Sequence, residues 1–246
     1  MRSLVVGLLA SVAALALPPM SAHAGSFSIS PIRLDLSATA RTAALTVRND
    51  DREALVQAEI MLWEQVDGQD RLTPTRDLLV SPAVFTLPPN GSQLVRVALR
   101  SPPGDATREL SYRLILQEVP QTASPGFSGL QVALRLSVPV FVAIVGTTGP
   151  VLTWSAAATG AGLVLTAQNS GDVHARIHGF SVMPAAGDGA PLAQPAAAYI
   201  LPGQSRHWNL GHNQGDTPPP GSWRRLRLKI SSEDGESEAE LDTVYE

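Results

Sequence analysis

Apolar residues recur at every second position in short runs along most of the chain. The clearest run covers residues 130–145, where the residues between the apolar ones begin as Gln131, Ala133, Arg135 and Ser137. A period of two is typical of a β-strand with one buried face. At more than about ten residues, this strand is about twice the usual length. An exposed apolar edge of that length favours aggregation, so its presence requires an explanation. Its leading apolar positions are Leu130, Val132, Leu134, Leu136 and Val138.

The same pattern predicts an all-β protein. Turn-forming residues separate the runs, such as Asp67-Gly68 and the Pro-Pro-Asn-Gly segment at 88–91. Seven strands in about 120 residues is the count of an immunoglobulin-like sandwich. The expected strands of this part are 27–36, 43–48, 55–63, 84–87, 94–99, 110–119 and 130–145.

A second domain is expected after the segment Gly-Thr-Thr-Gly-Pro at 146–150, where the composition changes. The strands beyond it are shorter and its loops are longer, which predicts a smaller sandwich. We therefore expect an N-terminal domain at 25–146 and a C-terminal domain at 147–246. The expected strands of the second domain are 152–154, 163–167, 175–182, 199–201, 205–210, 225–230 and 238–244.

Residues 1–24 have the features of a cleaved signal peptide. Arg2 precedes an apolar segment at 4–17, and Ala22-His23-Ala24 forms a cleavage motif. A membrane anchor is the alternative, but the apolar segment is short for a span and two prolines follow it. We therefore expect an exported protein with no membrane insertion.

Composition excludes several kinds of chemistry. The chain has no cysteine, so an exported domain of this kind must hold its core without disulfides. The net charge is −4, and the basic residues of 224–229 alternate with apolar ones as on the wet face of a strand. No nucleic-acid partner is expected. Motifs for nucleophilic elbows, phosphate loops and zinc helices are absent, so we expect no enzyme, no catalytic residue and no cofactor.

Two groups of polar residues have an alternative, chemical interpretation. His174 and His178 have the spacing of a helical metal pair, but they lie in an expected strand and no third ligand is fixed nearby. Asp67, Asp70 and Asp77 surround a hairpin, and paired carboxylates are able to act in acid–base catalysis, but carboxylates in such places more commonly form turns. We expect hydrogen-bonded or solvent-facing histidines, turn-forming aspartates and no metal site.

Arg33 follows a change in the alternation of the first strand. Phe27 and Ile29 share one parity, Leu34 and Leu36 share the other, and the change falls at Ser30-Pro31. A strand that changes face at a proline can begin in one sheet and end in the other. Arg33 would then lie just after the crossing, although a plain surface arginine is the alternative.

Arg113 lies in the expected strand at 110–119. If that strand forms a hairpin with 130–145, the loop is centred near Pro125, and paired residue numbers sum to about 250. Arg113 would then lie opposite Ser137 to Pro139, where the apolar alternation of the long strand ends. Arginine is well shaped to hold a carboxylate by two parallel hydrogen bonds.

Four segments together resemble the periplasmic chaperones of the chaperone–usher pilus pathway, the PapD-like family, and most closely its archaic, spore-coat-U-type branch. The likeness runs from about residue 27 to residue 144. The segments are SPIRLDLS with LTVRND, then TPTRDLLVSPAVFTLPPNGSQLVRVALR, RELSYRLILQEVP and LQVALRLSVPVF.

The resemblance implies two immunoglobulin-like domains in a boomerang arrangement and a function in the periplasm. Such a chaperone lends its last N-domain strand to a pilin-like subunit that lacks its own final strand, and an outer-membrane usher then takes the subunit. The apolar residues of 130–138 would be the pegs that enter the subunit's groove. When free, the edge would favour self-association.

The resemblance also implies residues that anchor the subunit's terminal carboxylate. Arg33 falls on the family's cleft arginine. The family's second anchor, a lysine late in the last strand, corresponds to Pro139 here, so Arg113 is the expected substitute. Arg135 is the other candidate, four residues before Pro139.

Glu109 matches an acidic residue that helps to fix the interdomain angle in the family. Its usual arginine partner corresponds to Ala143 here, so that ion pair is absent. The alternative to a chaperone is a secreted β-sandwich that binds a ligand such as sugar or forms part of a surface structure. Such a module would carry clustered exposed aromatic residues, and aromatic residues make up 5% of the chain.

Overall fold

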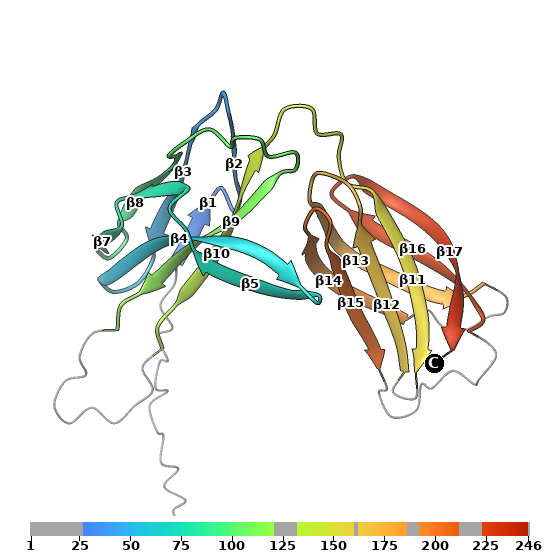
Figure 1. Cartoon of the computed structure of the whole chain (residues 1–246). Coiled ribbons are helices and arrows are strands. Elements are labelled where there is room, and N and C mark those ends of the chain that lie inside the picture. The colour runs from blue at the N-terminus through green and yellow to red at the C-terminus, as the bar shows by residue number, and fades with distance from the viewer. Residues whose placement is uncertain (1–26, 121–131, 160–161, 186–191, 212–222, 246) are drawn as a thin grey trace, which may run out of the picture.

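The computed structural model describes residues 27–120, 132–159, 162–185, 192–211 and 223–245, and these ranges hold strands and no helix. Figure 1 shows two β-domains that meet at an angle, the first coloured blue to green and the second yellow to red. The expected all-β class and two-domain arrangement are confirmed. No helix in the described ranges is long and apolar enough to cross a membrane.

The N-terminal domain is a sandwich of two sheets. One sheet has the order β1-β3-β8-β6, and the other has the order β2-β10-β9-β4-β5, with β7 pairing to β4. The bounds are β1 Phe27–Ser30, β2 Leu34–Ser37, β3 Thr42–Asn49, β4 Ala54–Val66, β5 Gln69–Pro74, β6 Leu78–Ser81, β7 Val84–Leu87, β8 Ser92–Leu99, β9 Leu110–Glu118 and β10 Arg135–Ala143.

The first expected strand does cross between the sheets. β1 pairs antiparallel with β3 in one sheet, and β2 pairs parallel with β10 in the other. The crossing lies at Ser30-Pro31, a cis peptide, where the alternation of apolar residues changes. Leu34 and Leu36 therefore enter the sandwich core at 2% exposure each.

The hairpin of β4 and β5 extends beyond the sandwich towards the second domain (Figure 1). Its turn is Asp67-Gly68, and both residues have positive φ, as two-residue hairpin turns require. The turn was expected, but β5 was not, because its sequence QDRLTP is mostly polar and carries no apolar alternation.

The C-terminal domain is one continuous set of seven strands in the order β14-β13-β16-β17-β11-β12-β15. Its core gathers apolar side chains from both ends of this order, including Ile177, Leu226 and Leu165. The strands are longer than the sequence pattern predicts. Their bounds are β11 Leu152–Thr159, β12 Gly162–Asn169, β13 Ala175–Pro184, β14 Leu192–Ile200, β15 Ser205–Gly211, β16 Arg225–Ser232 and β17 Gly235–Tyr245.

Candidate functional site

One edge of β10 is free over most of its length. β9 pairs with β10 from Arg135 to Val142, but β2 covers its other edge only from Val140 to Ala143. Among the described strands, none pairs with that edge over residues 135–139. Free N–H and C=O groups on an edge strand are a template for another chain.

The apolar row of β10 runs from the domain's core out past its end. Val138, Val140 and Val142 are fully buried in the sandwich. Leu136 is partly buried against the same core, Leu134 is partly buried, and Val132 is 47% exposed. These six residues all have the same parity, so they form one continuous row whose side chains become more exposed towards Val132.

This gradient separates the five expected pegs. Val132, Leu134 and Leu136 are accessible in whole or in part. Val138 is occupied by the protein's own core, because it lies inside the sandwich beside Val140, and it has no apolar surface left for a partner. Leu130 lies outside the described residues.

Glu118 holds the start of this apolar row in place. Its backbone N–H donates to the carbonyl of Leu134 at 2.8 Å, and its carboxylate Oε2 accepts from the Leu134 N–H at 3.2 Å. Glu118 is 8% exposed, so the carboxylate acts from inside the structure. The contact prolongs the pairing of β10 with β9 by one step beyond the ladder.

Two arginines flank Pro139 on the face of this sheet that turns away from the sandwich core. Arg113 on β9 is the registered partner of Pro139, within the range expected from the hairpin. Arg33 immediately precedes Leu34, whose partner on β10 is Val140. Residues in register share a face, and two strand spacings place the two arginine Cα atoms about 10 Å apart. Side chains of that length can converge on one carboxylate.

Arg113 lies on aromatic rings and has no acidic partner. Its Cζ is 3.6 Å from the centroid of Trp63 and 5.7 Å from that of Tyr199. Within the described part of the chain, no carboxylate forms a hydrogen bond or ion pair with it. Burial lowers the pKa of the guanidinium, and Asp70 and Tyr199 raise it. Arginine stays charged under such shifts, so the guanidinium of Arg113 is a cation that can bind an anion.

Arg33, in contrast, has acidic partners already. Its Nη1 donates to Glu233 Oε1 at 2.6 Å and to Oε2 at 2.9 Å, and its Nε donates to Asp35 at 3.1 Å. Burial raises the pKa of Glu233, but the hydrogen bond and charge of Arg33 outweigh this and lower it. The structure therefore places Arg33 in an ion pair that joins the two domains.

Arg135 is not brought to this pair. It is exposed, its registered partner is Gln117, and it lies four residues before Pro139, about 13 Å along the strand. It shares the face of Arg113 but not its position.

Glu109 contacts the C-terminal domain. Its Oε1 lies 2.6 Å from His174 Nδ1 and accepts from the His174 N–H at 3.2 Å. The imidazole stacks on Phe141 with 3.6 Å between ring centroids. No sequence signal pointed to His174 as the partner of Glu109; the family's usual arginine was only known to be replaced by Ala143. His174 is hydrogen-bonded and His178 is exposed, as expected.

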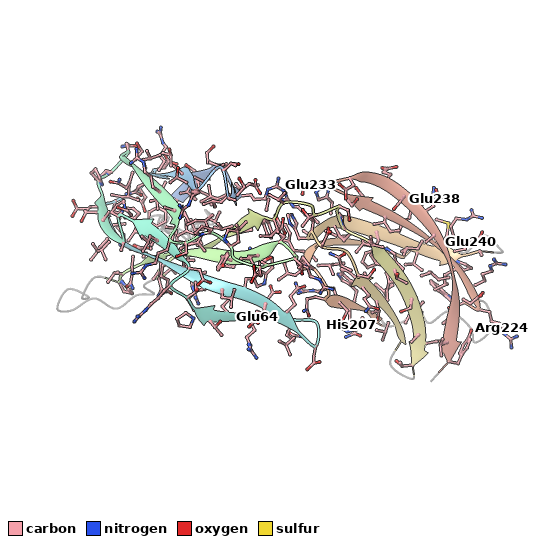
Figure 2. The ribbon with its side chains drawn as sticks, turned by 45° about the horizontal axis from the view of Figure 1, so that its top comes forward. Glu64, His207, Arg224, Glu233, Glu238 and Glu240 are labelled. Carbon is pink, nitrogen blue, oxygen red and sulfur yellow. The ribbon has the colours of Figure 1, made fainter. Side chains whose placement is uncertain are left out.

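The two domains share a small apolar cluster in which Trp63 and Phe141 are buried with Leu201. Beside it, the amide of Gln65, 2% exposed, binds the backbone of the second domain. Gln65 Nε2 donates to the Tyr199 carbonyl at 2.9 Å, and Oε1 accepts from the Leu201 N–H at 3.0 Å. The amide of Gln65 thus supplies the donor and the acceptor that a neighbouring strand would offer to the backbone at the end of β14. His207, labelled in Figure 2, lies against the tip of the hairpin at Gly68.

Replacing Gln65 by leucine is expected to loosen the domains. It leaves the Leu201 N–H and the Tyr199 carbonyl buried without partners, at about 1–3 kcal/mol each. Small-angle X-ray scattering should show a larger radius of gyration and a broader spread of interdomain angles. Gln69→Leu, the same change at an exposed position on the hairpin, is the control. An unchanged scattering curve for Gln65→Leu would show that the amide does not fix the angle.

No group of three His, Asp or Glu side chains in the described ranges is placed to hold a metal ion. The features that remain are the free apolar edge of β10 and the two arginines at its inner end.

Known proteins share this architecture. Residues 26–143 match the family described as "Pili and flagellar-assembly chaperone, PapD N-terminal domain". The chain is 31% identical over 97 residues to the chaperone protein FaeE of Escherichia coli. The match covers 39% of this chain and 35% of FaeE, so the chain spans about a third of that curated relative.

Solved structures extend the likeness to both domains. A chain of the CsuC–CsuE chaperone–tip subunit pre-assembly complex, from archaic chaperone–usher Csu pili of Acinetobacter baumannii, matches with a TM-score of 0.65 at 20% identity. The match covers 89% of this chain and 99% of that one. A chain of the Salmonella enterica SafA pilin–SafB chaperone complex matches with a TM-score of 0.59 at 19% identity, covering 89% and 97%. These likenesses support the two-domain fold.

Proposed function

We propose that the chain, whose residues 26–143 match the PapD N-terminal domain family of pili and flagellar-assembly chaperones, is a periplasmic chaperone of pilus subunits. It binds a pilin-like subunit by donor-strand complementation through the free edge of β10. It then delivers the subunit to an outer-membrane usher. Residues 1–24 act as the signal peptide for export, and the domain boundary lies near Gly146.

The observation that carries this proposal is that the apolar row of β10 continues beyond the end of the sandwich core. Val132, Leu134 and Leu136 continue the line of Val138 and Val140 where the sandwich no longer covers them. Fully burying an aliphatic side chain contributes about 1.5–3 kcal/mol. Because Leu134 and Leu136 are already partly buried, the three side chains would supply at most about 5–9 kcal/mol, before the cost of association. A subunit with an open groove gains a strand and a row of core side chains together.

The two arginines mark the point where the free edge of β10 ends. From Val132 to Pro139 an extended chain covers about 24 Å, and at the end of that distance the edge of β10 becomes covered by β2. A subunit strand lying along the free edge would stop there, with its terminal carboxylate near Arg33 and Arg113. The carboxylate would fix the register of the strand, which an alternating apolar pattern alone does not specify.

The free edge of β10 also predicts self-association of the chain. A free chain is expected to associate with a second copy through β10, because an unpaired apolar edge is unstable in water.

The alternative function, a sugar-binding module, would need clustered exposed aromatic side chains. In the described ranges only Tyr245 among the aromatic residues is exposed, at 52%, so no observation favours that alternative.

Co-expression with a pilin-like protein tests the proposal. The subunit should accumulate only when this chain is present, and the two should elute together from a gel-filtration column. A subunit whose yield is the same without the chain would contradict the chaperone function.

A further inference from the structure

In the chain without a bound subunit, the carboxylate of Glu233 is paired with Arg33. It lies in the turn between β16 and β17, and Figure 2 shows it where the two domains meet. Both oxygens lie within 2.9 Å of Arg33 Nη1. A chain-terminal carboxylate would offer the same two oxygens to the same guanidinium.

Arg113 differs from Arg33 in this respect. It lies in the same row across the sheet, but its guanidinium lies on the rings of Trp63 and Tyr199. Asp70 attracts it by charge, yet no carboxylate in the described ranges forms an ion pair with it. One cation of the pair is thus open to an incoming anion, and the other is occupied.

We propose that Glu233 is an internal stand-in for the subunit's terminal carboxylate, which must displace it from Arg33. This inference rests on the proposed chaperone function. The incoming carboxylate meets Arg113 first and reaches Arg33 only as Glu233 leaves. Glu233 therefore sets how strongly a free carboxylate is selected over other chain ends.

The surroundings of Glu233 allow this exchange without opening the domains. Its backbone N–H donates to the Arg176 carbonyl at 3.0 Å, so the turn stays attached when the side chain rotates. Arg176 exerts an attractive charge on Glu233. The displaced carboxylate therefore keeps a cationic neighbour, and Gln65 and Glu109 still hold the domains together.

The exchange also keeps Arg33 paired before the subunit binds, whereas Arg113 is stabilised by the rings of Trp63 and Tyr199. A guanidinium withdrawn from water without a partner is unfavourable. Glu233 compensates Arg33 before the subunit binds and again after it leaves. One carboxylate replaces another, so binding at this position stays reversible, as a chaperone that passes its subunit on requires.

The test uses the full chain and a fluorescein-labelled peptide of alternating valine and threonine, made with a free C-terminal carboxylate or a C-terminal amide. Fluorescence anisotropy measures binding of both peptides. Glu233→Gln should tighten binding of the acid peptide about two- to fivefold and leave the amide peptide unchanged. Asp234→Asn removes the same charge one residue away and should change neither.

The background of Arg33→Ala separates displacement from a general charge effect. If Glu233 acts through Arg33, Glu233→Gln has no effect on the acid peptide once Arg33 is gone. An equal gain in both backgrounds, or no gain in either, overturns the inference while the chaperone function stands. Peptide binding that is insensitive to Leu134→Glu in every variant overturns the use of the β10 edge and the inference with it.

Discussion

Replacing Leu134 by glutamate is expected to abolish complex formation with a pilin-like subunit while the chaperone itself stays folded. Leu134 is only partly buried and lies before β10 begins, so the domain's core does not depend on it. In the complex its side chain would enter the subunit's groove, where an unpaired carboxylate costs several kcal/mol. A loss of about a thousandfold in affinity follows. Gel filtration of the co-expressed proteins, with circular dichroism of the free variant, measures both parts.

Ala133→Glu is the matched control for this change. Ala133 is exposed and has the opposite parity, so the same charge would point away from the groove. It should leave the complex in place. A stable complex with Leu134→Glu, or equal losses in both variants, would show that the subunit binds elsewhere.

Much of the N-terminal domain could be predicted because its signals are local. The change of parity at Ser30-Pro31 predicted the crossing between sheets, and β1 and β2 do pair in different sheets. The hairpin estimate placed Arg113 opposite Ser137 to Pro139, and the register puts it at Pro139. Both inferences needed only the period of two and the length of one loop.

The accessible length of the peg row could not be predicted in the same way. Val138 and Leu134 have the same parity and similar chemistry. They differ because Val138 lies inside the sandwich and Leu134 lies beyond it. Alternation specifies which face a side chain takes, whereas the end of the core depends on strands that are distant in sequence.

The interdomain contacts were missed for a related reason. Gln65 binds the backbone near residue 200, and Arg33 binds Glu233, so each pair joins parts of the chain more than a hundred residues apart. A polar residue in a strand predicts an exposed face, and Gln65 is buried only because the second domain packs on it. Together with Glu109 and His174, these contacts join the domains although the arginine expected at Ala143 is absent.

Removal of both cleft arginines is expected to weaken subunit binding about a hundredfold or more. A hydrogen bond between charged groups contributes about 1.5–3 kcal/mol, and the carboxylate would lose one such partner on each side. Arg113→Ala should have the larger single effect, because Arg113 has no acidic partner to give up when the subunit binds. Arg33→Ala should have the smaller one, because the gain at Arg33 is reduced by the loss of its bond to Glu233. Isothermal titration calorimetry with the purified subunit, or recovery of the co-expressed complex, gives the comparison.

Arg135→Ala provides the control, since Arg135 lies on the same face of β10 and is exposed. A general attraction between a basic face and an acidic subunit would make all three arginines equivalent, and high salt would remove their effects alike. Anchoring of one carboxylate predicts instead that Arg33 and Arg113 are coupled and that Arg135 is independent of both. The same subunit with an amidated C-terminus should lose the contributions of Arg33 and Arg113 and retain those of the pegs. If amidation leaves the affinity of the unmodified chaperone unchanged, the two arginines serve the interdomain structure and not the subunit.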